Sequence, residues 1–317
     1  MACYGSKKGQ MMTATDWRGV FPAATTQFAE DLTIDLDATS AVVGSLVEDG
    51  VHGLIAMGTV GENTSLTADE KRKVLAAIIG VVDGRVPVLT GVSELTTDLA
   101  KTYTIDAARI GADGLMLLPA MVYVPTEAEL EAHIRTVAAA TSLPVMLYNN
   151  PPAYRVSISL DTLNRLADVE TLVAVKESAP DPRRITDILN RCGDRYLVFA
   201  GLDDVALEEI LLGAVGWVSG LTNAFPAESI ALWDAVESGD IETARAIYRW
   251  FMPLLHLDAE HDLVQSIKLA EQVMGRGSER VRMPRLPLTG ARRAEVIAMV
   301  EAARDTRPLK LPSVLAH

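Results

Sequence analysis

Short apolar runs alternate with longer amphipathic stretches along most of the chain. Eight such runs are four to six residues long, which is typical of strands buried on both faces of a parallel sheet. The stretches between them carry helix-start signals, because Thr67 and Thr126 each stand three residues before a Glu, as in a capping box. Glycines stand where these helices should end. The runs occupy residues 19–24, 52–57, 86–91, 114–118, 145–148, 172–175, 197–200 and 217–221.

Eight strands that alternate with helices predict an α/β protein with a (β/α)8 TIM barrel. We assign the barrel to residues 17–240, and we expect residues 241–306 to form a C-terminal helical appendage, because no Pro/Gly/Ser-rich linker separates them. Residues 1–16 are expected to be a disordered lead-in, and residues 307–317 a tail. An open doubly wound sheet is the alternative, but no Gly-x-Gly-x-x-Gly follows the first run.

Composition narrows the class of partner. The 317 residues include 29 Lys and Arg against 42 Asp and Glu, for a net charge of −13. This balance argues against nucleic acid or an anionic membrane surface as the main partner, but a small anionic substrate stays possible because a few local donors can overcome a distant negative field. No apolar stretch is long enough to span a bilayer, residues 1–16 lack the apolar centre of a signal peptide, and Cys3 and Cys192 are too few for a disulfide scaffold. We therefore expect a cytoplasmic protein. The five histidines lack metal-ligand spacing, so no metal is expected.

Lys176 ends the sixth run and is the strongest single candidate for chemistry. Period-two alternation places Leu172, Ala174 and Lys176 on one face, inside the barrel, if Val173 and Val175 face the helices. Burial disfavours the ammonium form and lowers the pKa of a lysine, and the free amine can attack a carbonyl to form a Schiff base. The alternative is a lysine at a strand end that binds a carboxylate, which on position alone is the commoner case.

Two further strand ends carry candidate groups. Tyr148 ends the fifth run, where its phenol can pass a proton or simply fill the barrel. Residues 58–63 (Gly-Thr-Val-Gly-Glu-Asn) follow the second run, and their amides with the Thr59 hydroxyl can hold a carboxylate or phosphate. An ordinary strand-to-helix turn is equally compatible with this segment. Asp203 and Asp204 follow the seventh run, where capping of the next helix is commoner than binding a hydroxyl.

Together these motifs resemble one family. A Gly-Thr-x-Gly-Glu turn, a Tyr-Asn-x-Pro segment from Tyr148 and a Lys-Glu-Ser strand end at Lys176 occur in order. The sequence is similar to the dihydrodipicolinate synthase / N-acetylneuraminate lyase family, which are class I, Schiff-base-forming aldolases on a (β/α)8 barrel. The resemblance covers about residues 17–305, including the helical tail, and the family's usual spacing of 28 residues separates Tyr148 from Lys176.

The resemblance implies a role for individual residues. Lys176 looks like the Schiff-base lysine and Tyr148 like the general acid/base. Thr59 and the amide of Val60 look like the clamp for the carboxylate of a 2-oxo acid, and Thr59 also assists the proton relay.

The same resemblance implies the surroundings of the site and the assembly. Gly201 and Val218 are similar to backbone positions that line the family's pocket. The family implies a homotetramer built as a dimer of dimers, and neither a metal nor an organic cofactor.

Departures from the family pattern concern the substrate. Val60 stands where these enzymes usually have a second hydroxyl residue, and Ala153 stands where the synthase has an arginine for its second substrate. Tyr123 matches the tyrosine that the synthase lends across its dimer only with a one-residue shift. Whether Arg155 turns into the pocket in place of the missing arginine is open. The lysine-biosynthetic synthase is therefore disfavoured.

Three segments resemble one branch more closely. Residues 58–63, 148–156 and 246–255 are similar to the Δ1-pyrroline-4-hydroxy-2-carboxylate deaminase of hydroxyproline catabolism. This resemblance implies deamination and dehydration of that cyclic imine to 2-oxoglutarate semialdehyde. The alternatives are a 2-oxo acid aldolase, acting as a sugar-acid or hydroxy-oxoglutarate lyase, and the synthase. A barrel that binds a 2-oxo acid as a sensor, without catalysis, is the non-enzyme alternative.

Overall fold

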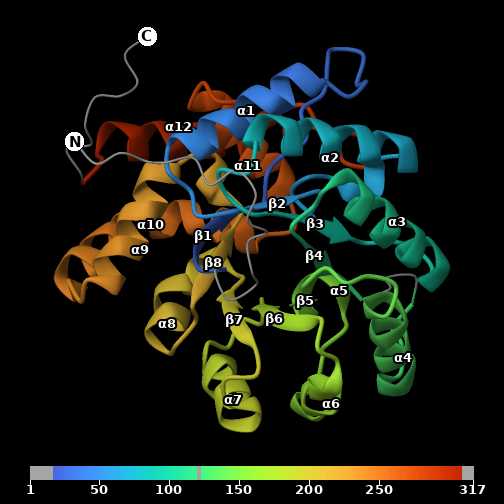
Figure 1. Cartoon of the computed structure of the whole chain (residues 1–317). Helices are drawn as coiled ribbons and strands as arrows, with labels where there is room; N and C mark the ends of the chain where they lie inside the picture. The colour runs from blue at the N-terminus through green and yellow to red at the C-terminus, as the bar shows by residue number, and fades with distance from the viewer. Residues whose placement is uncertain (1–16, 120–122, 309–317) are drawn as a thin grey trace, which may run out of the picture.

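Eight parallel strands form a nearly closed barrel surrounded by helices in the computed structural model, which describes residues 17–119 and 123–308 (Figure 1). The strand order is β1-β8-β7-β6-β5-β4-β3-β2. The first and last strands in this order, β1 and β2, are brought together beyond the end of β1, where the amide of Ala24 donates to the carbonyl of Ile55 at 2.9 Å. The predicted (β/α)8 barrel is therefore confirmed, whereas the lead-in at 1–16 and the tail from residue 309 lie outside the described residues.

Each predicted run overlaps an observed strand, and the ends differ by at most two residues. The strands are β1 (Gly19–Pro22), β2 (Leu54–Ala56), β3 (Val88–Val92), β4 (Gly114–Leu117), β5 (Val145–Asn149), β6 (Leu172–Glu177), β7 (Leu197–Ala200) and β8 (Gly216–Ser219).

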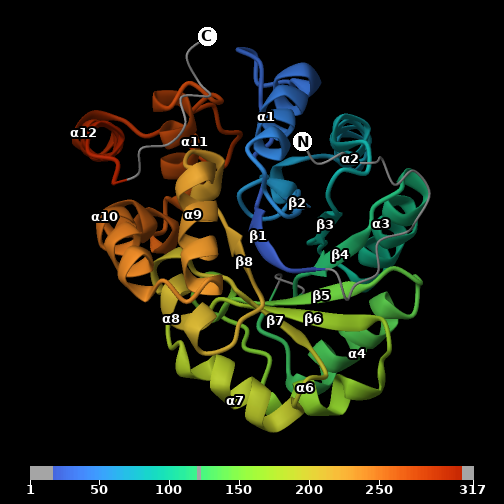
Figure 2. The same cartoon turned by 60° about the vertical axis from the view of Figure 1, so that its left-hand side comes forward.

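The α-helices cover the outside of the barrel, and α9 to α12 gather on one side of it (Figure 2). They are α1 (Leu36–Glu48), α2 (Ala68–Val82), α3 (Thr97–Ile110), α4 (Glu127–Ala138), α5 (Pro151–Tyr154), α6 (Leu160–Arg165), α7 (Arg183–Cys192), α8 (Ala206–Leu211), α9 (Pro226–Glu237), α10 (Ile241–Ala259), α11 (Leu263–Val273) and α12 (Gly290–Asp305). Short 3₁₀ helices are η2 (Asn63–Ser65), η3 (Leu166–Asp168), η4 (Asp203–Val205) and η5 (Leu221–Asn223).

Local chemistry at the helix ends follows the sequence pattern. Thr67 caps α2 and Thr126 caps α4, each in a full capping box with the Glu three residues later. At the other ends, Gly111 is the C-cap of α3 with φ of 106° and Gly193 follows α7 with φ of 60°. These are left-handed backbone angles that a residue with a Cβ rarely adopts.

The inside of the barrel is packed with large side chains at its N-terminal end. Trp17 is buried against Gly114, the first residue of β4, where a Cβ would lie 2.4 Å from the indole ring. Phe21 and Phe199 meet edge to face with ring centroids 5.3 Å apart. A larger apolar layer lies between the strands and the helices. This packing leaves space only toward the C-terminal ends of the strands.

The predicted alternation along β6 is correct at its end and wrong at its start. Ala174 packs in the barrel interior as expected, but Leu172 belongs to the outer layer and Val173 packs toward the interior. The cause is a register shift, because Val145 pairs with Leu172 whereas Met146 pairs with Ala174. A bulge of this kind inserts one extra residue and exchanges the faces of its neighbours.

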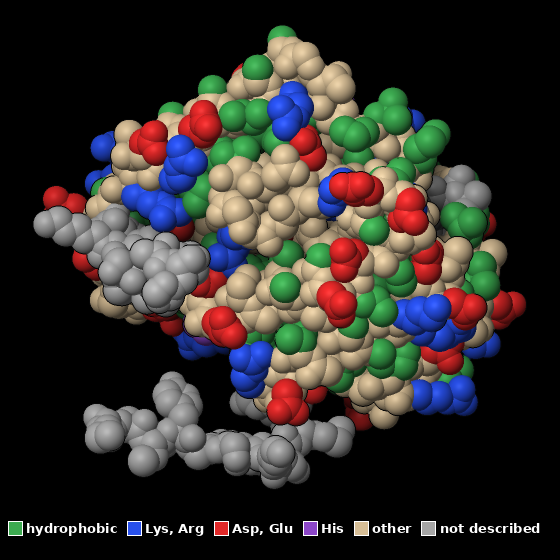
Figure 3. All heavy atoms as spheres, turned by 90° about the horizontal axis from the view of Figure 1, so that it is seen from above, with side chains coloured by type: hydrophobic (Ala, Val, Ile, Leu, Met, Phe, Trp, Pro, Cys, Tyr) green, Lys and Arg blue, Asp and Glu red, His purple; other side chains and the backbone are tan. Residues whose placement is uncertain are grey.

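Polar contacts attach the C-terminal helices to the barrel. Lys268 on α11 is fully buried and donates to the Glu62 carboxylate at 2.9 Å and to the Thr26 carbonyl at 2.8 Å. Arg276, after α11, bonds to Asp49 at 2.6 Å. In the part of the chain that the structure describes, no helix combines the length and apolar character needed to cross a bilayer. On the face shown in Figure 3, Lys and Arg side chains are interspersed with Asp and Glu.

Candidate active site

A narrow cavity opens where the C-terminal ends of the strands meet. It contains Lys176, Tyr148, Thr59, Val60 and Gly201, five of the residues singled out from the sequence. A wider hollow between α3 and α4 lies on the outer surface and contains none of them. The other lining residues of the strand-end cavity are Ala23, Gly58, Met116, Asn150, Ala153, Leu202, Gly220, Asp258 and Leu263.

Lys176 is held inside the barrel near the end of β6. Its side chain is 6% exposed, and its Nζ lies 4.2 Å from the centre of the Tyr148 ring. Burial lowers the pKa of Lys176 to about 8, although the nearby carboxylates of Asp258, Asp203 and Glu209 act in the opposite direction. The unprotonated fraction of this amine near neutral pH is therefore larger than that of an ordinary lysine, and this form can attack a carbonyl carbon.

Tyr148 lies beside the lysine because β5 and β6 pair in parallel with Tyr148 opposite Lys176. Its hydroxyl accepts a hydrogen bond of 2.8 Å from the Asn150 amide, and its ring meets that of Tyr154 edge to face at 5.7 Å. Burial raises the pKa of Tyr148 to about 12, so the phenol keeps its proton at neutral pH. The fixed hydroxyl can donate and accept a proton at the lysine.

The turn after β2 leaves several of its amides without an acceptor among the described residues. The amides of Glu62 and Asn63 are used inside the turn, on the carbonyls of Thr59 and Gly58. Within residues 17–119 and 123–308, no acceptor is found for the amides of Thr59 and Val60. The Thr59 hydroxyl is hydrogen-bonded to the phenol of Tyr154. This arrangement can receive a carboxylate.

Gly201, directly after β7, makes room for the lysine. A Cβ at this position would lie 2.3 Å from the Ser178 hydroxyl and 2.8 Å from Cγ of Lys176. Any larger residue would therefore displace the lysine side chain. Val218 is fully buried in the interior apolar cluster of the barrel, and it is not among the residues that line the cavity.

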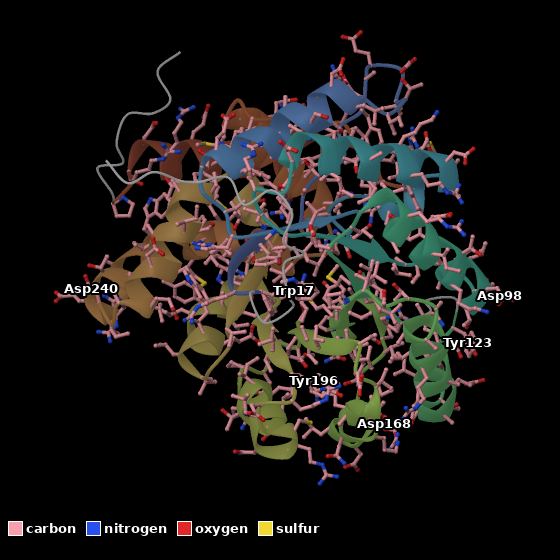
Figure 4. The ribbon with its side chains drawn as sticks, in the orientation of Figure 1. Trp17, Asp98, Tyr123, Asp168, Tyr196 and Asp240 are labelled. Carbon is pink, nitrogen blue, oxygen red and sulfur yellow. The ribbon has the colours of Figure 1, made fainter. Side chains whose placement is uncertain are left out.

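The structure does not bring two other sequence candidates into this cavity. Tyr123 is 58% exposed and lies at the outer edge of the molecule (Figure 4). Arg155 is also exposed, although Ala153 two residues earlier lines the cavity. Residues 120–122, which precede Tyr123, lie outside the described residues. Of the residues that the structure places around the cavity, Lys176 is the only cation.

The helix-capping role expected for the Asp pair after β7 is wrong. Asp203 is buried and accepts hydrogen bonds from Trp217 Nε1 at 2.9 Å, the Ser219 hydroxyl at 3.0 Å and the Leu221 amide at 2.9 Å. It therefore joins the end of β7 to the end of β8. Asp204 instead pairs with His256 at 2.9 Å. The aspartates were visible in the sequence, but their partners come from other strands and from α10.

Sequence reasoning missed Asp258, Asn150 and Tyr154. Asn150 and Tyr154 belong to the segment already considered around Tyr148, but their contacts depend on how α5 folds back. Asp258 left a signal that could have been used: it stands four residues after Leu254 and seven after Phe251, on the buried face of α10. A carboxylate at such a position interrupts an apolar helix face.

The site has the groups for Schiff-base chemistry. A desolvated amine, a fixed phenol, and a turn with free amides surround one small space. Among residues 17–119 and 123–308, no cluster of His, Cys, Asp and Glu is arranged to hold a metal ion. That the reaction needs neither metal nor cofactor stays a prediction.

Comparison with known proteins identifies a family and relatives whose names agree with the lyase chemistry that the site suggests. Residues 16–303 match the Dihydrodipicolinate synthetase family. The chain is 33% identical over 273 residues to a 4-hydroxy-tetrahydrodipicolinate synthase of Salinibacter ruber, covering 86% of this chain and 90% of that protein. It is 32% identical over 287 residues to an uncharacterized DapA-like lyase of Rhizobium meliloti, covering 89% and 94%.

Solved structures agree with these matches. Dihydrodipicolinate synthase from Aquifex aeolicus is similar with a TM-score of 0.87 and 29% identity, covering 91% of this chain and 98% of that one. YagE, a prophage protein of the dihydrodipicolinic acid synthase family from E. coli K12 solved in complex with pyruvate, has a TM-score of 0.86 and 27% identity, covering 91% and 99%.

Proposed function

The chain belongs to the dihydrodipicolinate synthetase family and is a class I aldolase-type lyase, and on this premise we propose that it deaminates and dehydrates Δ1-pyrroline-4-hydroxy-2-carboxylate. The product is 2-oxoglutarate semialdehyde, as in hydroxyproline catabolism. The observation that carries the proposal is the pairing of a desolvated Lys176 amine with a cavity that has no second cation among its described lining residues. Such a cavity suits a substrate with one carboxylate.

Lys176 opens the reaction as a free amine. It attacks C2 of the cyclic imine, and transimination releases the ring nitrogen as a primary amine on C5. Thr59 and the amide of Val60 hold the substrate carboxylate, and Tyr148 carries the protons that the exchange requires. The lysine imine acidifies C3, and loss of the C3 proton expels the C4 hydroxyl as water.

The remaining steps are proton shifts and hydrolyses. Proton shifts convert the C5 amine of the unsaturated intermediate into an imine. Hydrolysis of this imine releases ammonia, and hydrolysis of the lysine imine releases the 2-oxo acid. One water is expelled and two are consumed, so the net reaction uses one water and yields one ammonia. The oxidation of C5 is balanced by the reduction of C4 within the substrate, so no external redox partner is required.

Three other functions use the same residues differently. A 2-oxo acid aldolase would use Lys176 and Tyr148 to break a carbon–carbon bond and release pyruvate or glyoxylate. A synthase is supported by the names of several relatives, but Ala153 offers no guanidinium to a second substrate carboxylate. A sensor would bind a 2-oxo acid without forming an imine.

Borohydride trapping tests the proposal. The protein is incubated with 4-hydroxy-Δ1-pyrroline-2-carboxylate or with pyruvate, then reduced, while ammonia is assayed and the adduct is mapped by mass spectrometry. We expect ammonia release and an adduct on Lys176. Lys176→Ala should lower turnover by about 10³-fold or more, whereas Lys101→Ala on the surface of α3 is the matched control.

Each contrary result has a defined meaning. A pyruvate adduct on Lys176 without ammonia from the imine would replace the deaminase with an aldolase or synthase. No adduct with either compound, but measurable binding, would favour the sensor. Normal turnover in Lys176→Ala would remove the Schiff-base role.

Assembly belongs to the same proposal. We expect a homotetramer with subunit contacts that include the loops after β3 and β4. These neighbouring loops expose Leu95, Tyr123 and Val124, each more than half exposed in the single chain, and such patches are commonly covered by a partner. A cytoplasmic location likewise stays a prediction.

A further inference from the structure

Asp258 brings a negative charge into the cavity from outside the eight-fold repeat. It lies in the last turn of α10, after the barrel strands have ended. Among the described residues that line the cavity, those with a charged side chain are Asp258 and Lys176. Its neighbours on the buried face of the helix, Leu254 and Leu255, are apolar, so the carboxylate is an exception on that face.

The fold makes space for this carboxylate. Gly220, directly after β8, has no side chain, and a Cβ there would lie 2.4 Å from Oδ1 of Asp258. The other oxygen, Oδ2, accepts a long hydrogen bond of 3.4 Å from the amide of Asp203. Within the described part of the chain, Oδ1 has no hydrogen-bond donor. The group is thus positioned but retains acceptor capacity toward the cavity.

Asp258 and Lys176 influence each other without direct contact. Burial raises the pKa of Asp258 and the charge of Lys176 lowers it, while Asp258 is the carboxylate that acts most strongly on Lys176. The described residues nevertheless show no ion pair between the two groups. The other titratable groups that act on Asp258 or Lys176 are Asp203, Asp204 and Glu209. Both groups line the same cavity, so a ligand bound there can contact the amine and the carboxylate together.

The strand order fixes where a substrate meets Asp258. Tyr148 on β5 flanks Lys176 on one side, whereas β7 and β8, beside which Asp258 lies, follow on the other side. The turn that holds Thr59 follows β2, further round the barrel. A substrate joined to Lys176 and held by its carboxylate at Thr59 thus meets a phenol on one side and a carboxylate on the other.

The geometry points to Asp258 as the specificity-determining residue of the site: its carboxylate binds a hydrogen-bond donor on the substrate, a hydroxyl or an amine beyond the 2-oxo carbon, and repels a second carboxylate there. This inference rests on the proposed function for the place of the substrate. In the proposed substrate, the donor is the C4 hydroxyl or the C5 amine released by ring opening. Two carboxylates brought into contact in a poorly solvated cavity repel each other strongly.

Asp258→Asn removes the charge and keeps the shape. Pyruvate has no distal group and 2-oxoglutarate has a distal carboxylate, so the ratio of their affinities reports on Asp258. We expect the variant to bind 2-oxoglutarate about 10-fold more tightly relative to pyruvate than the native protein does. Glu242→Gln, an exposed residue in the first turn of α10, is the matched control and should leave the ratio unchanged.

A second comparison identifies the donor. Δ1-pyrroline-2-carboxylate lacks the C4 hydroxyl of the proposed substrate. If the hydroxyl is the donor, the native protein prefers the hydroxylated imine and Asp258→Asn loses the preference. If the amine is the donor, the native protein binds both imines similarly and the variant weakens both. Unchanged affinities for both imines, together with an unchanged 2-oxoglutarate ratio, would overturn the inference.

Two measurements separate this inference from the proposed function. Affinities are measured by calorimetry, which needs no imine, whereas adduct and ammonia assays report on the reaction. If the native protein forms no adduct but still discriminates against 2-oxoglutarate through Asp258, the deaminase proposal is wrong and the recognition role of Asp258 stands.

If Asp258→Asn does not fold, the native protein still supplies a test, because lowering the pH from 8 to 5.5 protonates part of Asp258. The discrimination against 2-oxoglutarate should then narrow, and a constant ratio would count against Asp258.

Discussion

Two buried lysines in this chain differ in what surrounds the amine. Lys268 is fully buried but donates to Glu62 and to the Thr26 carbonyl, so its charge is satisfied. Lys176 has a tyrosine ring beneath its amine and carboxylates only at a distance. Burial lowers the pKa of both lysines, but only the second amine is open to the cavity. The reactivity proposed for Lys176 therefore depends on the absence of a close ion-pair partner as much as on burial.

Replacing the phenol tests the proton-transfer role. Tyr148→Phe keeps the ring against Lys176 but removes the hydroxyl, so turnover should fall by about 10²–10⁴-fold while the borohydride adduct on Lys176 still forms. Tyr196→Phe is the control, because Tyr196 is also buried and donates one hydrogen bond, to the Leu163 carbonyl at 2.8 Å. Similar turnover losses in both variants would indicate a packing effect instead.

In the helices and strands, features set by neighbouring residues could be predicted from the sequence, whereas features set by contacts between distant segments could not. The capping boxes at Thr67 and Thr126 depend on neighbouring residues, and both are confirmed. The faces of Leu172 and Val173 depend on pairing with β5, where a register shift breaks the alternation. Asp258 reaches the cavity only because α10 packs beside the ends of β7 and β8. The sequence marks Asp258 as an exception on an apolar helix face, but it does not tell which strand ends that face meets.

The ion pair between α11 and the turn after β2 provides a prediction for these elements. Lys268→Met keeps the length of the side chain but leaves the Glu62 carboxylate buried without its cation. The free energy of unfolding should fall by about 3–5 kcal/mol, measured by denaturant titration. Arg304→Gln, which breaks an exposed pair with Asp305, should change it by less than about 1 kcal/mol. Equal effects would mean that the buried pair does not anchor α11.

The whole molecule carries several carboxyl groups in its interior. Glu209 on α8 is buried, and its Oε1 has no partner among the described residues. Burial raises the pKa of Glu209 to about 9 and that of Glu271 to about 7. The folded state therefore holds protons that the unfolded state releases above its ordinary carboxyl pKa. The stability from these protons is complete at low pH and is lost as the pH rises toward the folded-state values.

Glu209→Gln isolates one of these groups. The variant has no proton to lose, so its melting temperature relative to the native protein should rise as the pH increases from 5 to 8. The comparison cancels contributions from other groups, including His52 and His133, whose pKa values burial lowers. Glu301→Gln on the surface of α12 is the control. A melting-temperature difference that stays constant with pH would show that Glu209 ionises normally in the folded state.

The groups around the cavity come from two different parts of the fold. Lys176 and Tyr148 stand on barrel strands and the turn that contains Thr59 directly follows one, whereas Asp258 stands on a helix that follows the barrel. In the proposed mechanism, the groups that make and break bonds and the group that selects the substrate therefore come from separately encoded segments. After gene duplication, substitutions near the end of α10 can change the accepted substrate without disturbing the strands. Paralogues that descend from this enzyme should diverge first at that helix, and its grafting onto a related barrel is a route to new substrate ranges.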